Sequence, residues 1–89
     1  MIDLHAAVFT AKQKAAEVLG QTPLNLEEIE REVYQGKDVW TITLSFARNL
    51  DNVAPIARLG LDPLQYKRFL IDAETGELLA MKLREVAQR

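Results

Sequence analysis

The strict alternation of side chains over residues 39–46 constrains the fold of this chain more than any other feature. One set comprises Trp40, Ile42, Leu44 and Phe46, and the other comprises Val39, Thr41, Thr43 and Ser45. Successive side chains of a β-strand point to opposite faces of a sheet, so this period of two predicts a strand with one strongly apolar face. We call the face that carries Ile42 the core face, and the opposite face, which carries Thr41, the far face.

The residues before this strand predict its partner in a β-hairpin. A tight turn at Gly36-Lys37 would place Val33 opposite Trp40. Arg31 then points to the core face, where an inward charge on an edge strand discourages edge-to-edge aggregation. The same register predicts an acidic row on the far face, made of Glu28, Glu30 and Glu32.

A second hairpin is predicted from residue 69 to residue 83, with its turn in residues 72–77. Gly76 suits the positive φ of such a turn, and the side chains of Asp72 and Thr75 can hydrogen-bond exposed turn amides. The register places Phe69 opposite Met81 on the core face, and Ile71 opposite Leu79. The far face of this hairpin is then formed by Tyr66, Arg68, Leu70, Leu78, Ala80, Lys82 and Arg84.

Residues 3–19 predict one amphipathic helix. Asp3 suits the N-cap, Gly20 suits the left-handed position after the last turn, and Pro23 prevents continuation. The apolar residues recur at three- and four-residue spacing, as expected for a helix that covers a sheet: Leu4, Val8, Ala11, Ala15, Val18 and Leu19.

These elements predict an α+β fold in a single domain, residues 1–89, with one N-terminal helix packed on a four-stranded antiparallel meander. Trp40 is expected in the core with one edge in water. The connection 49–65 is long for so small a domain, and long connections are often functional. The predicted core comprises Val8, Ala11, Ala15, Ile29, Val33, Ile42, Leu44, Phe46, Phe69, Ile71, Leu79 and Met81.

The last hairpin and the order of elements resemble the PepSY domain family. An apolar strand ends in Ile71-Asp72, the turn ends in Thr75-Gly76-Glu77, and a second apolar strand begins near Leu79. The resemblance implies a PepSY/cystatin-like fold and a non-catalytic module of a kind found in secreted or membrane-tethered proteins and in peptidase propeptides, where inhibition has been proposed. The family has no catalytic residues to transfer. We recognise no export signal, transmembrane helix or peptidase in these 89 residues and therefore expect a setting that differs from the usual one of the family.

The inventory of reactive side chains argues against an enzyme. The chain has no cysteine, and His5 is its one histidine. Ser45 is the one serine, and the predicted fold places it on the far face while His5 begins the helix on the other side. The row of Glu28, Glu30 and Glu32 has a spacing of about 6.5–7 Å along a strand, and no histidine is near. We therefore expect no catalytic residues, no metal site and no cofactor.

Charge and hydropathy indicate the cellular location and the classes of partner that we expect. The net charge of −2 provides no basic surface for nucleic acid or for an anionic membrane. The N-terminal residues lack the basic start and apolar core of a signal peptide, and no apolar run approaches the roughly 20 residues of a membrane span. We expect a cytoplasmic, bacterial protein without a membrane partner.

The far face is the candidate interaction surface. The acidic row lies at one edge, basic Arg68, Lys82 and Arg84 lie toward the other, and Leu70, Leu78 and Ala80 form an apolar spot between them. The sequence therefore predicts a non-catalytic interaction or regulatory module, including an inhibitory one, that binds a protein partner or a second copy as a homodimer. Two alternatives stay open: a small ligand-binding or enzymatic domain with a pocket between the connection 49–65 and the sheet, and an antitoxin or immunity-type partner protein.

Overall fold

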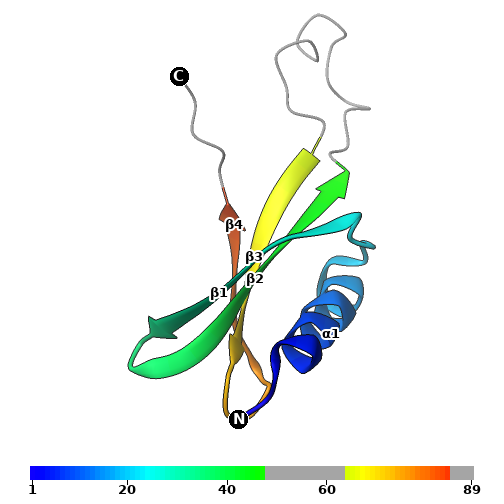
Figure 1. Cartoon of the computed structure of the whole chain (residues 1–89). Helices are drawn as coiled ribbons and strands as arrows, with labels where there is room; N and C mark the ends of the chain where they lie inside the picture. The colour runs from blue at the N-terminus through cyan, green and yellow to red at the C-terminus, as the bar shows by residue number, and fades with distance from the viewer. Residues whose placement is uncertain (48–63, 85–89) are drawn as a thin grey trace, which may run out of the picture.

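One helical layer packs on one face of a four-stranded antiparallel sheet (Figure 1). The computed structural model describes residues 1–47 and 64–84. The elements in chain order are α1 (Leu4–Lys14), the π-helical segment η1 (Ala15–Leu19), β1 (Asn25–Tyr34), β2 (Lys37–Ala47), β3 (Leu64–Asp72) and β4 (Leu78–Arg84). The strands lie in the order β1-β2-β3-β4, which confirms the predicted α+β meander. Most of the connection 49–65, up to residue 63, lies outside the described residues.

The helical segment made of α1 and η1 begins and ends as its capping residues predict. The Asp3 Oδ1 atom accepts a hydrogen bond from the Ala6 amide at 2.9 Å, and Gly20 has φ of +66°. The last turn is wider than an α-helical turn, which changes the direction of its side chains. As a result Leu19 packs against the core, whereas Val18, also predicted to point inward, is 58% exposed.

The core lies between the helix and the core face of the sheet. Ala7, Ala11 and Ala15 are fully buried, and their small side chains allow the helix to lie close to the strands. The Trp40 ring is half-buried, and its Nε1 donates to the Ile2 carbonyl at 3.2 Å, as expected for a core tryptophan with one accessible edge. The strands contribute the fully or almost fully buried Ile42, Leu44, Phe46, Phe69 and Ile71.

Three other predicted core residues, Val8, Ile29 and Met81, are half-buried and pack against this core. Two predictions were wrong. Val33 is 71% exposed, because the helix packs on β2, β3 and β4 and leaves the outer half of β1 uncovered. Leu79 lies outside the core cluster and is replaced there by Leu78.

The turn of the first hairpin differs from the prediction. Gln35 and Gly36, with φ of 51° and 81°, form the two-residue turn, as a type I′ turn requires, in place of Gly36-Lys37. The pairing therefore shifts by two residues, so that Arg31 and not Val33 lies opposite Trp40. This shift of two preserves the face of each side chain from Glu28 to Val33, so the acidic row stays on the far face. A further register shift between Leu26 and Glu28 places Leu26 opposite Leu44, on the core face.

The second hairpin has the predicted turn but carries an extra residue in β4. Asp72 Oδ1 accepts from the amides of Glu74 and Thr75, at 2.7 and 3.2 Å, and Gly76 has φ of +80°. Phe69 pairs with Met81 as predicted. The register then shifts between Leu70 and Ile71, so that Ile71 pairs with Leu78. Leu79 is the extra residue of β4 in this bulge. The strand therefore begins pairing one residue earlier than predicted, and Leu78 lies on the core face.

Candidate functional site

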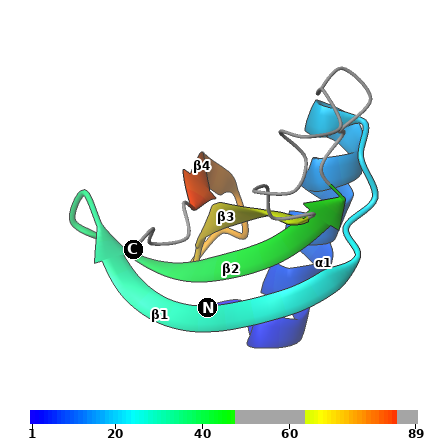
Figure 2. The same cartoon turned by 90° about the horizontal axis from the view of Figure 1, so that it is seen from above.

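The far face is not the open surface that the sequence predicted. Val39, Thr41, Thr43 and Ser45 of β2 are at most 1% exposed, and Leu70 of β3 is 3% exposed. β1 and β2 are strongly curved (Figure 2), and the Lys82 Nζ of β4 lies 4.9 Å from the centre of the Tyr34 ring of β1. Side chains from the two edge strands thus meet across the centre of this face.

The apolar spot predicted at Leu70, Leu78 and Ala80 is therefore absent as an exposed patch. Leu70 is buried, Ala80 is half-buried, and Leu78 packs against the core on the other face. The sequence prediction failed because alternation states which residues share a face and not how far a sheet curves over itself. Whether these residues bind a partner stays a prediction.

The charged members of the predicted surface come from β1, β3 and β4. Glu30, Glu32 and Lys82 are exposed, while Glu28, Tyr66 and Arg68 are half-buried. The backbone of Arg84 pairs with Tyr66, and its side chain lies outside the described part of the structure. The acidic row lies on the edge strand β1, whereas the Lys82 Nζ of β4 reaches the Tyr34 ring of β1 and the charge of Arg68 on β3 acts on Glu30, so the two signs of charge are not separated at opposite edges.

Electrostatic crowding is strongest in the acidic row. A side-chain hydrogen bond with Glu32, together with the negative charges of Glu32 and Glu28, raises the pKa of Glu30, and the charge of Arg68 opposes this only in part. The buried Arg68 Nε and Thr41 Oγ1 have no hydrogen-bond partner. Glu30 therefore lies among like charges that Arg68 offsets only in part.

Within the described residues, Ser45 and His5 lie on different elements and do not meet. The Ser45 hydroxyl donates to the Asn25 carbonyl at 3.4 Å on the far face, whereas His5 is exposed on the first turn of α1. Within residues 1–47 and 64–84, no group of three His, Cys, Asp or Glu side chains is arranged to hold a metal ion. Nor does any helix of that part have the length and apolar character needed to cross a membrane.

The core face of β1 forms a second surface, which sequence reasoning missed. Its side chains, which we call the β1 strip, are Leu26, Ile29, Arg31 and Val33. Because α1 packs on the other three strands, Leu26 and Val33 are 40% and 71% exposed. The Arg31 guanidinium lies 5.0 Å from the centre of the Trp40 ring and 3.7 Å from Asp38 Oδ2. An aliphatic–arginine–tryptophan surface of this kind has the composition of protein interfaces.

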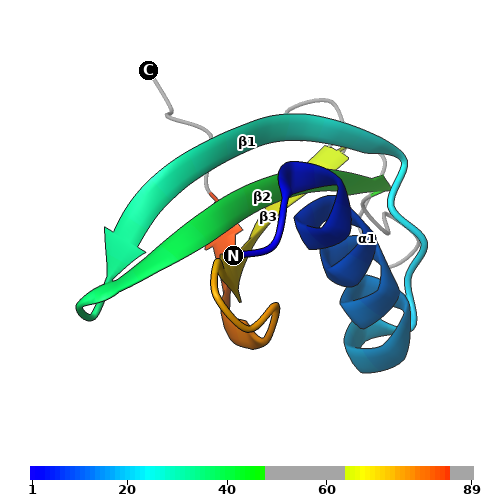
Figure 3. The same ribbon diagram turned by 60° about the horizontal axis from the view of Figure 1, so that its bottom comes forward.

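Figure 3 shows that β1 arches past the helix and that the segment after η1 leads to the start of β1. That segment, α1 and η1 line a half-open hollow of about 300 Å³, formed by Lys12, Ala16, Thr22, Pro23, Leu24 and Asn25. Leu24 is 54% exposed, and the exposed Phe9 lies on α1 together with Lys12. Phe9 lies off the apolar stripe of the helix. Its position in the sequence therefore already indicated an apolar side chain outside the core.

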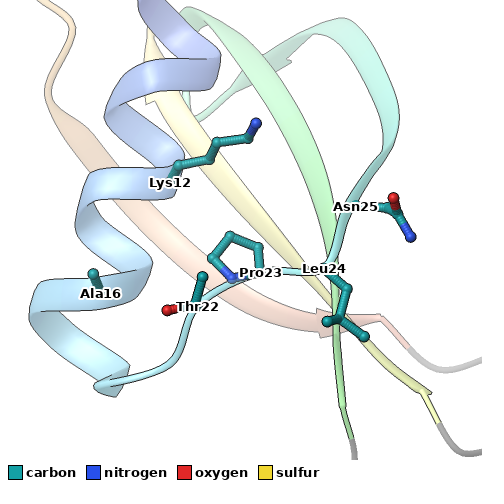
Figure 4. Close-up of a pocket in the computed structure, with 6 residues that line it drawn as sticks. All are labelled: Lys12, Ala16, Thr22, Pro23, Leu24 and Asn25. Atoms are coloured by element: carbon teal, nitrogen blue, oxygen red, sulfur yellow. The ribbon is translucent and has the colours of Figure 1, made fainter.

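The polar ends of Lys12, Thr22 and Asn25 point in different directions from this hollow (Figure 4). A ligand site instead brings a few polar groups toward one point. The hollow therefore extends the exposed apolar surface near the start of β1 and has no arrangement for a small polar ligand.

Comparisons with protein-family models, with curated proteins and with solved structures find no match to this chain. The fold and the exposed surfaces are therefore the basis for any functional conclusion.

Proposed function

We propose that this chain is a non-catalytic, PepSY-like protein-interaction module that binds its partner through β1. The observation that carries the proposal is the uncovered β1 strip, where Leu26 and Val33 are exposed beside the stacked Arg31 and Trp40. Exposed apolar side chains that share one strand face are typical of interaction surfaces. The PepSY assignment, a cytoplasmic location and the antitoxin or immunity-type role remain predictions from the sequence.

The proposal moves the candidate surface from the centre of the far face to the edge strand. Leu70 is too buried to contact a partner, whereas Glu30, Glu32 and Val33 are exposed along a single strand. The alternative of a pocket against the connection 49–65 involves residues outside the described part, and no observation on the described residues favours it.

Site-specific photocrosslinking in cells of the source organism tests this function. A photoreactive amino acid replaces Val33 or Leu26 on the strip, and Gln13, an exposed position of α1, in the control protein. We expect one defined crosslinked protein from the two strip positions and none from Gln13. Equal labelling from all three positions, or no crosslink at the strip, would contradict the proposal.

A further inference from the structure

The outer edge of β1 offers unpaired backbone groups. β1 is an edge strand that pairs only with β2 in the described part of the chain. In a hairpin closed by a two-residue turn, the residues that flank the turn, here Tyr34 and Lys37, exchange both backbone hydrogen bonds. Alternate residues then direct their N–H and C=O groups away from β2, and in β1 these are Ile29, Arg31 and Val33.

The core-face side of this edge has space for apolar side chains. The helix packs mainly on β2, β3 and β4, so it leaves the core face beside Val33 uncovered. The core-face side chains of a strand added beside β1 would lie next to Ile29 and Val33, of which the second is 71% exposed. Apolar residues at alternate positions of an added strand would therefore be partly buried by contact with the strip.

The far-face side of the same edge favours positively charged side chains in an added strand. Glu30 and Glu32 are exposed there, and a side-chain hydrogen bond with Glu32, together with the negative charges of Glu32 and Glu28, raises the pKa of Glu30. Residues opposite Glu30 and Glu32 in an added strand would sit at the closer, non-hydrogen-bonded pairs, where opposite charges stabilise a sheet and like charges destabilise it.

We infer that β1 accepts a fifth, antiparallel strand from a partner protein, in which apolar residues on the core face alternate with lysine or arginine on the far face. This inference rests on the proposed function and adds the conformation and chemistry of the bound segment. The backbone groups of Ile29, Arg31 and Val33 supply hydrogen bonds, and Glu30 and Glu32 select the basic partner.

A second copy of β1 does not fit this position. An antiparallel pair of β1 strands centred on Arg31 would put Glu30 of each copy directly opposite Glu32 of the other. Such like-charge pairs are destabilising, so the acidic row excludes self-pairing while it favours a basic strand.

The test uses an acetylated and amidated peptide of alternating valine and lysine, added to the whole ¹⁵N-labelled chain. We expect the amides of Ile29, Arg31 and Val33 to exchange with solvent at least about tenfold more slowly in its presence. The amides of Glu30 and Glu32, which already face β2, serve as internal controls and change less. Binding without this alternating protection would overturn strand addition.

Matched peptides and variants test the charge pattern. Glu30→Lys/Glu32→Lys should weaken binding at least about tenfold, because two favourable cross-strand pairs become repulsive. Glu74→Lys/Glu77→Lys changes the net charge equally at exposed glutamates of the other hairpin and should bind the peptide like the wild type. A peptide of the same composition with all valines before the lysines should bind much more weakly, and an alternating valine–glutamate peptide should not bind.

Three results would overturn the inference: equal binding of the block-sequence peptide, equal weakening by both double variants, or slow exchange of the three amides through self-association without peptide. Each of them is compatible with defined crosslinks at Val33 and Leu26. Failure of strand addition is therefore distinguishable from failure of the proposed interaction function.

Discussion

At the scale of single residues, Asp72 shows how one carboxylate organises a turn. It is 5% exposed, its Oδ1 accepts the amides of Glu74 and Thr75, and its Oδ2 lies 3.9 Å from Lys37 Nζ. Hydrogen bonds from the Glu74 and Thr75 amides lower the pKa of Asp72, with a smaller contribution from the charge of Lys37. The ionised side chain is therefore favoured in the folded state.

This lowered pKa predicts a pH dependence with a definite sign. A depressed folded-state pKa stabilises the fold above the ordinary value of 3.8, and that contribution is lost as pH falls through the folded pKa. Asp72→Asn keeps one acceptor oxygen but cannot ionise, so its stability should fall less than that of the wild type between about pH 5 and pH 2. Urea unfolding followed by Trp40 fluorescence measures the difference. Parallel pH profiles of the two proteins would contradict this role of Asp72.

Gly76 makes a second prediction at the residue scale. Its φ is +80°, and an added Cβ would lie 3.6 Å from the Ile2 side chain, an ordinary contact, so the cost of substitution comes from the backbone. Gly76→Val should destabilise by more than about 1 kcal/mol. Gly76→Asn should cost less, because asparagine tolerates the left-handed region. If thermal unfolding shows the same loss of stability for Gly76→Val and Gly76→Asn, the cost comes from packing and not from the backbone.

At the scale of secondary-structure elements, the turns explain which predictions succeeded. The Asp72 turn was predictable because its side chains act on amides two or three residues away. The first hairpin offered two overlapping two-residue turns, Gln35-Gly36 and Gly36-Lys37. The structure has the first of these, with Gly36 in the second position of the turn. The bulge in β4 was not predictable, because Leu78 and Leu79 are identical and either can fill the core.

Gln35 predicts a stabilising change in this element. It has φ of 51° in a type I′ turn, where asparagine is preferred at the first position. Gln35→Asn should therefore raise the free energy of unfolding by about 0.5 kcal/mol or more. Gln35→Val should lower it, because a β-branched residue is strained at positive φ. A stabilising valine, measured by urea denaturation, would rule out this turn geometry.

At the scale of the whole molecule, the position of the helix decides which surface is exposed. The alternation in β2 correctly predicted which residues share a face, because it depends on one strand. The coverage of each strand depends on where α1 lies across the sheet, and its contacts with β2, β3 and β4 leave β1 open. The acidic row was predicted correctly because it depends on alternation within one strand. The β1 strip was missed because its exposure depends on where the helix lies across the sheet.

The curvature of the sheet leads to the last prediction, since it gives the domain two buried faces. Phe69 is fully buried on the core face, and its neighbour Leu70 is 3% exposed on the far face. Phe69→Ala should cost about 3–5 kcal/mol, as expected for a large core side chain. Leu70→Asp should also destabilise or unfold the protein, because it introduces a charge into a site without a partner.

Leu83→Asp is the matched control, because Leu83 lies on β4 and is 56% exposed. Circular dichroism and thermal unfolding should show a stable Leu83→Asp variant beside a destabilised Leu70→Asp variant. If Leu70→Asp proves as stable as the control, the far face is accessible to solvent. Leu70 and Ala80 would then return as candidates for partner contact, in competition with the β1 strip.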